Sequence, residues 1–173
     1  MNNTAVLSNT RFTFRSYRTY LAALAFIAGN VIVPQLCHLI PRGGLIFLPI
    51  YFFTLVASFR CGWKAGLLTA VLSPLVNCAF FGMPPVAALP AILIKSVSLV
   101  FLAELLSRKM GFSLLSVALA VVGYQLIGSI FEFFLDFNLA HALQDIRIGW
   151  PGILIQIVLG YLAVKLLFRW KQS

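Results

Sequence analysis

Four polar side chains on one predicted helix could bind a polar or charged solute. They are spaced by four, three and four residues, so they share one helical face: Gln125, Ser129, Glu132 and Asp136. Lys95, in the preceding apolar segment, offers a complementary positive charge. Ionisable groups at membrane depth are costly and usually face a protein interior or a cavity. We therefore expect Lys95 and Glu132 either to pair with each other or to contact a bound solute.

Nearly all the other strongly polar residues of the apolar segments lie in the halves that we predict to face outward, with Glu104 at the inner interface as the exception. The inner halves are almost wholly apolar, which argues against a continuous pore or proton wire. The pattern predicts a polar pocket that opens outward above an apolar floor. For Asn30, Asn77 and Gln156, ordinary interhelical hydrogen bonds are an equally good interpretation. The candidate substrate-binding residues are Asn30, His38, Asn77, Lys95, Gln125, Ser129, Glu132, Trp150 and Gln156.

The elements that must position these residues are transmembrane helices. The 173-residue chain is 61% hydrophobic and only 10% charged. Soluble domains carry about 25% charged residues, and a spanning helix needs about 20 mainly apolar ones. We predict an all-α integral membrane protein with a single domain (1–173). Its six helices are expected at about 17–37, 45–59, 61–81, 86–106, 111–137 and 150–168.

Clustered basic residues predict that both termini are cytoplasmic. Six helices place the following four groups on one side: Arg11, Arg15 and Arg18; Arg60 and Lys64; Arg108 and Lys109; Lys165, Arg169 and Lys171. Cytoplasmic loops carry an excess of Lys and Arg, so this side is expected to be cytoplasmic. The excess of positive charge is then explained by the membrane topology and by contact with anionic lipid headgroups. We therefore expect no nucleic acid as a partner. Glu104 is expected to pair with Arg108, four residues later.

The sequence contains no recognisable motif for catalysis, a cofactor or a metal. It lacks a phosphate-binding Gly-Lys-Ser/Thr loop, so we do not expect it to hydrolyse nucleotide. Ser129 could be a nucleophile, but both histidines lie in predicted outer loops and cannot serve as its base. Cys37 and Cys78 are predicted near outer helix ends. There they would either form a disulfide or, the interpretation that we favour, pack as small apolar residues.

Over about residues 17–170 the chain resembles the substrate-binding S component of energy-coupling factor (ECF) vitamin transporters. The resemblance is carried by His38-Leu39-Ile40 with Gly43-Gly44, Phe47-Leu48-Pro49-Ile50, Gly62 with Ala65-Gly66-Leu67, and Gly82-Met83-Pro84-Pro85. It implies a multi-pass protein of the bacterial cytoplasmic membrane that takes up a vitamin or vitamin-like molecule and is not itself an enzyme. The implied partners are a transmembrane coupling subunit and two cytoplasmic ATPases.

The resemblance also implies a face of small residues that contacts the coupling subunit. Family members often carry Ala-x-x-x-Ala on the first helix, whereas this chain has Ala25-x-x-x-Gly29, with Ala22 on the same face. Packing within the same bundle is an equally good interpretation of these residues. The alternative function is a non-transport six-helix membrane scaffold, like the cell-shape protein MreD. Such a scaffold would not need Lys95 and Glu132 to converge on an outer pocket.

Overall fold

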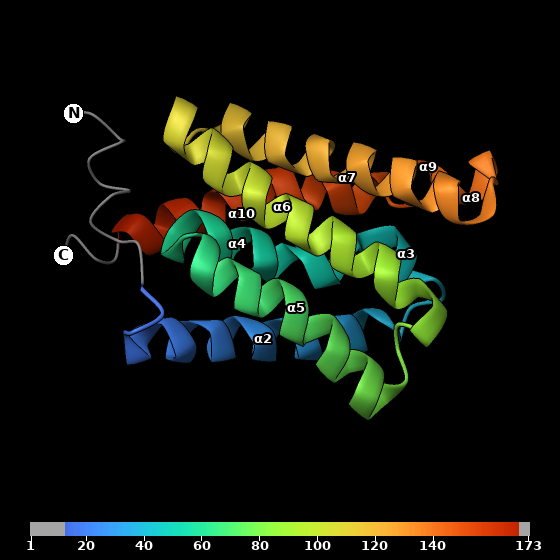
Figure 1. The fold of residues 1–173 in the computed structure, drawn as a ribbon, viewed down its shortest axis with the longest axis horizontal. Helices are drawn as coiled ribbons and strands as arrows, with labels where there is room; N and C mark the ends of the chain where they lie inside the picture. Colours follow the sequence, from blue (N-terminus) through green and yellow to red (C-terminus); the bar gives the residue numbers. More distant parts are fainter. Residues whose placement is uncertain (1–12, 170–173) are drawn as a thin grey trace.

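Long apolar helices make up most of the chain. The computed structural model describes residues 13–169, and these residues fold without β-strands. Five helices in this range are long and apolar enough to cross a membrane: α2 (Tyr17–Cys37), α5 (Trp63–Phe81), α6 (Leu89–Met110), α7 (Leu114–Asp136) and α10 (Trp150–Arg169). They run back and forth along one common direction (Figure 1). By helix length and hydropathy, the chain is a multi-pass membrane protein.

The second predicted helix, 45–59, is divided into three short pieces. They are α3 (Gly43–Phe47), the 3-10 helix η1 (Pro49–Tyr51) and α4 (Phe52–Cys61). Leu48 separates the first two pieces with a left-handed backbone (φ 47°, ψ 46°), a conformation that side-chain-bearing residues seldom adopt. The ten residues of α4 extend only about 15 Å, roughly half the hydrocarbon thickness of a bilayer. On its own, α4 is too short to reach across a membrane.

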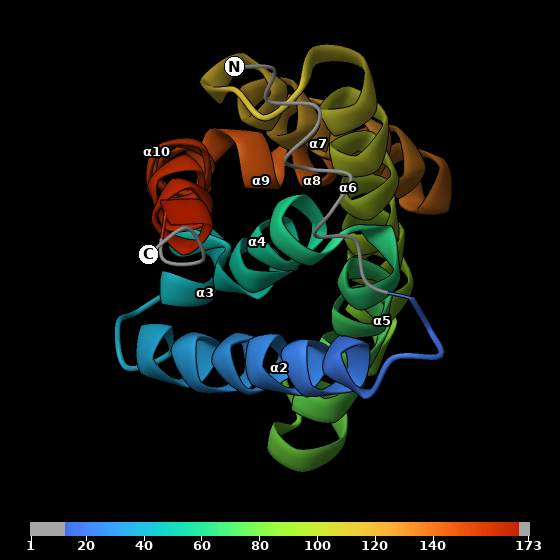
Figure 2. The same cartoon turned by 90° about the vertical axis from the view of Figure 1, so that its left-hand side faces the viewer.

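The short helix α4 lies at the centre of the bundle (Figure 2). Residues 54–59 are all buried, and α4 contacts α2, α5, α6 and α10. Two glycines allow neighbouring helices to approach it closely, because a Cβ on Gly66 would overlap Ser58 and one on Gly160 would lie 2.6 Å from Leu55. The helices around α4 are about twice its length, so they extend beyond its N-terminal end. The space above α4 is where the candidate site lies.

At the opposite end of the bundle, α2 and α5 begin and α4, α6 and α10 end (Figure 1). The basic residues Arg60, Lys64, Arg108 and Lys109 belong to these helix ends. Arg60 Nε donates to the Leu167 carbonyl at 3.2 Å, and its guanidinium lies 4.9 Å from the centroid of the Phe168 ring. The Lys64 ammonium lies 5.3 Å from the Phe14 ring centroid. These contacts join segments that are far apart in the sequence, and we refer to this end as the basic end.

The predicted pair at the basic end is confirmed. Arg108 Nε lies 2.7 Å from Glu104 Oε1, one turn apart on α6. The side chain of Arg169 is not among those described, and two other basic residues lie outside the described range: Arg11 and Lys171. The cysteines are all free thiols, so the disulfide alternative does not apply to Cys37, Cys61 or Cys78.

Candidate functional site

A cavity of about 450 Å³ lies above the N-terminal end of the short central helix. Residues 48–51 form its floor, and its walls come from the ends of α2, α5 and α7 and the beginning of α6. Two short helices between α7 and α10 contribute its rim: α8 (Leu139–Ala142) and α9 (Gln144–Arg147). Leu45, Met83 and Ile92 are among the apolar side chains that line it. Apolar walls with a few polar groups are the usual form of a small-molecule site.

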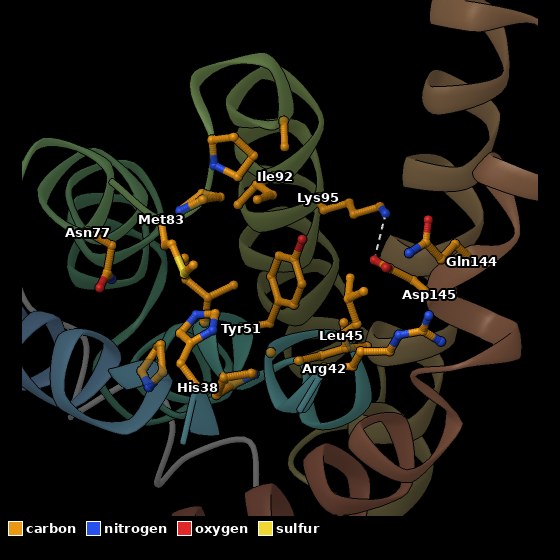
Figure 3. A pocket seen from close by; sticks show the side chains of 18 of the residues that line it. His38, Arg42, Leu45, Tyr51, Asn77, Met83, Ile92, Lys95, Gln144 and Asp145 are labelled. Carbon is orange, nitrogen blue, oxygen red and sulfur yellow. Dashed lines mark hydrogen bonds and ion pairs between the residues drawn. The ribbon is translucent and has the colours of Figure 1, made fainter. Parts of the chain in front are cut away.

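Lys95 lies in the cavity wall with its ammonium between two carboxylates. Lys95 Nζ donates to Glu132 Oε1 and to Asp145 Oδ2, each at 2.7 Å. The Lys95 side chain is 1% exposed, whereas Glu132 and Asp145 retain 15% and 14% exposure. Figure 3 shows the pair with Asp145 at one side of the cavity. Since the three residues come from α6, α7 and α9, the ion pairs connect three elements.

Gly128 provides the space that the Lys95 stem occupies. A Cβ at this position of α7 would overlap the Cγ, Cδ and Cε atoms of Lys95. Gly123, on the same helix, differs because a Cβ there would lie 2.8 Å from Leu102 Cδ1, the end of a flexible side chain. The absence of a side chain at position 128 lets the lysine stem lie against α7. Its ammonium can then reach both carboxylates.

Tyr51 presents a hydroxyl group to the cavity. The residue is only 2% exposed, and its ring packs against that of Tyr124 with centroids 5.0 Å apart. Its hydroxyl forms no hydrogen bond with any residue of the described range, and in Figure 3 it points into the cavity between Ile92 and Lys95. Because no protein group engages this hydroxyl, it is available to hydrogen-bond with a molecule in the cavity.

The structure brings together only part of the predicted site. Four of the predicted binding residues line the cavity: His38, Asn77, Lys95 and Glu132. Five do not line it: Asn30, Gln125, Ser129, Trp150 and Gln156. Gln125 and Ser129 are buried in α7 on the side of Glu132 that leads toward the basic end. Trp150 is 58% exposed at the beginning of α10, so this aromatic ring lies outside the cavity.

Asn30 connects α2 to two other helices. Its Nδ2 donates to Thr54 Oγ1 at 3.0 Å and to Ser73 Oγ at 3.3 Å, and its Oδ1 accepts from the Phe53 amide at 3.2 Å. Asn77 Nδ2 donates to the Asn30 carbonyl at 2.8 Å. Interhelical hydrogen bonding therefore accounts for Asn30. Asn77 takes part in the same network and also lines the cavity.

Gln156 holds the backbone that forms the cavity floor. It is fully buried, its Oε1 accepts from the Tyr124 hydroxyl at 2.8 Å, and its Nε2 donates to the Leu48 carbonyl at 3.2 Å. Leu48 is the residue with the left-handed backbone between α3 and η1. Gln156 therefore acts on a solute only indirectly, by fixing the position of the floor.

The cavity residues that are not identified from the sequence include Arg42, Tyr51 and Asp145. Asp145 and His141 lie in the predicted linker between the last two helices, and His141 is expected there to be solvated. His141 is indeed exposed, but it lines the rim, and its Nδ1 lies 2.6 Å from Asp136 Oδ2. The sequence does contain one indication that Asp145 belongs to the site. Three of the four acidic residues of the chain lie between positions 132 and 145.

The small residues on α2 are divided between the bundle interior and its exterior. A Cβ on Gly29 would lie 2.8 Å from Phe53 Cε1, so the space at Gly29 is occupied by a side chain of the same bundle. Ala22 is half-buried and Ala25 is exposed. Of the predicted coupling residues, Ala25 is therefore the one best placed to contact another protein.

Comparison with protein-family models, with curated proteins and with solved structures finds no match for this chain. The function is therefore inferred from the chemistry of the cavity, which combines a buried cation between two carboxylates, a free tyrosine hydroxyl and mostly apolar walls. Such a site can bind a small molecule that has a polar group and an apolar body.

Proposed function

We propose that the protein is a membrane-embedded solute-binding subunit that captures a small organic molecule in the cavity above α4. The observation that carries this proposal is the position of the cavity, at the end of the bundle remote from the basic end. Because Lys and Arg mark the cytoplasmic side, the cavity then opens to the outside and both termini are cytoplasmic. In this topology η1 and α4 complete a sixth crossing, which is buried by its neighbours.

Delivery of the solute requires more than this chain. Below the cavity the bundle is closed by packed side chains, among them Leu99, Val121 and Tyr124, which are fully buried. Close-packed protein interiors leave no path for a solute unless the side chains rearrange. We therefore propose that the chain works as an ECF S component that takes up a vitamin-like molecule across the bacterial cytoplasmic membrane. A coupling subunit, contacted through Ala25, and two cytoplasmic ATPases would drive delivery.

A second candidate function is a non-transport membrane scaffold. The pairing of Lys95 with both Glu132 and Asp145 favours it, because these ion pairs connect three elements whether or not a solute is bound. Tyr51 favours solute capture instead. Its hydroxyl faces the cavity without a partner among the described residues, so it adds no hydrogen bond that would hold the bundle together, but it can bind a solute.

Filling the cavity is expected to abolish solute capture. Ala88 lines the cavity, so the indole of Ala88→Trp would occupy the volume that a solute needs. Val86 lies in the same 3-10 helix, η2 (Val86–Ala88), and is 73% exposed outside the cavity lining. Val86→Trp is therefore a matched control. The measurement is mass spectrometry of the small molecules extracted from equal amounts of purified wild type and variants.

We expect a defined small molecule in near-equal molar amount from wild type and Val86→Trp, and none from Ala88→Trp. A wild-type protein that carries no small molecule would favour the scaffold. An unchanged amount in Ala88→Trp would show that the molecule binds elsewhere.

A further inference from the structure

We propose that the solute binds through a protonated amine or amidine group that contacts the carboxylates of Glu132 and Asp145. This inference rests on the proposed solute capture and names the chemical class of the solute. It follows from the distribution of charge, hydrogen-bond capacity and apolar surface around the cavity.

The buried part of the wall carries more negative than positive charge. The single ammonium of Lys95 faces two carboxylates. Each carboxylate uses one oxygen for Lys95, and Glu132 Oε2 and Asp145 Oδ1 accept no hydrogen bond from the described residues. An ionised carboxylate can accept about four hydrogen bonds, so both of these cavity-lining residues keep acceptor capacity. A second cationic donor would balance the charge of this wall.

Lys95 itself is poorly placed to bind an anion. Its side chain is 1% exposed, and two of the three ammonium protons are directed at the two carboxylates. An anionic solute would have to approach Glu132 and Asp145 to reach the ammonium. Like charges repel strongly in a partly buried site, where the effective dielectric constant is low. An anionic group is therefore disfavoured at this wall, whereas a cationic donor gains both hydrogen bonds and charge complementarity.

Two other basic groups line the cavity near its mouth, but neither neutralises this wall. Arg42 is exposed and forms no ion pair with any described residue, although Figure 3 shows its side chain running along the cavity edge toward Asp145. Solvent and salt screen a charge in such an exposed position. His141 is also exposed, and its ring is already engaged with Asp136.

Tyr51 provides an independent indication of a ligand. The residue is only 2% exposed, and its hydroxyl has no partner in the described residues and points into the cavity beside Lys95. A hydroxyl group can donate and accept, so it can bind either an N–H of the solute or a neighbouring acceptor. Leu45, Met83 and Ile92 line other parts of the cavity and suit an apolar body. The site therefore fits a small amphipathic cation.

Binding of three matched probes tests the charge class: benzamidine, benzamide and benzoate. They share one ring but carry a cationic, a neutral and an anionic group. Calorimetry would be performed at low ionic strength on the purified full chain in lipid nanodiscs, after removal of any co-purified molecule. We expect benzamidine to bind roughly tenfold or more tightly than the other two, because complementary charge mainly provides specificity.

Carboxylate variants test the contact itself. Glu132→Gln and Asp145→Asn are each expected to weaken benzamidine binding roughly tenfold while leaving benzamide binding unchanged. Asp136→Asn is the matched control, because Asp136 is an exposed carboxylate outside the cavity lining. Wild-type affinity for benzamidine in both cavity variants would overturn the carboxylate contact.

The possible outcomes distinguish this inference from the proposed function. Equal or tighter binding of benzoate or benzamide by the wild type would overturn the cationic class and leave solute capture standing. If no probe binds, the charge of the co-purified molecule decides: an amine or amidine supports the inference, and a neutral molecule or anion overturns it. The absence of both probe binding and a co-purified molecule would overturn solute capture as well.

Discussion

Lys95→Met is expected to lower the free energy of unfolding by roughly 3–5 kcal/mol, the usual cost of breaking a buried ion pair. The substitution removes the ammonium and leaves Glu132 and Asp145, both largely buried, without their shared cation. Methionine keeps a long unbranched stem, so the packing against Gly128 is largely preserved and the loss reports the charge. Reversible unfolding in mixed detergent micelles, followed by circular dichroism, measures the effect.

The matched control removes all three charges together. In Lys95→Met/Glu132→Gln/Asp145→Asn, no uncompensated carboxylate remains, so the triple variant is expected to recover most of the lost stability. A single variant as stable as the wild type would mean that the ion pairs do not hold α6, α7 and α9 together. A triple variant as unstable as the single one would assign the loss to packing.

Gly128→Ala is expected to destabilise the protein by roughly 1–3 kcal/mol, the usual cost of overpacking a core. The added methyl group would overlap the Lys95 stem, whose far end is held by two ion pairs. The stem therefore cannot swing aside without breaking those pairs. Alanine favours a helix over glycine by about 1 kcal/mol, so a net loss would show that the clash outweighs this gain.

Gly123→Ala, on the same helix, is the control for Gly128→Ala. Its methyl group would meet the Leu102 side chain, with Cδ1 2.8 Å away, and this side chain can change rotamer. We expect this variant to be neutral or slightly stabilised in the same unfolding measurement. Equal stability of the two alanine variants would contradict the tight packing of the lysine stem against α7.

The long helices could be predicted because each is a long, mainly apolar run. Helix α2 begins and ends at the predicted residues, Tyr17 and Cys37. The break in the second segment could not be predicted, because apolar character does not report a left-handed backbone. Leu48 has that conformation in contact with Gln156, whose Nε2 binds the Leu48 carbonyl from 108 residues away in the sequence. Only the folded bundle brings these groups together.

The candidate site could be predicted where a charge stands out against an apolar background. Lys95 and Glu132 are such charges, and they do line one cavity. Asp145 could not be distinguished from a solvated linker residue, because its position depends on α9 forming the cavity rim. Tyr51 looks like any other aromatic residue of a membrane helix. Asn30 has its hydrogen-bond partners on two other helices, which the sequence does not specify.

Reaction of a cysteine inside the cavity, measured on intact cells, tests most directly whether the cavity opens outward and holds a solute. Ile92→Cys places a thiol in the cavity lining, in a background where the three native cysteines are replaced by alanine. Ala103→Cys, on the same helix but fully buried in the core, is the control. The reagent is a small, membrane-impermeant methanethiosulfonate.

We predict that Ile92→Cys reacts from outside the cell, that the molecule extracted from the purified protein slows this reaction, and that Ala103→Cys does not react. Reaction of Ile92→Cys only after the membrane is permeabilised, or at a rate that the extracted molecule does not change, would contradict capture of a solute in an outward-opening cavity.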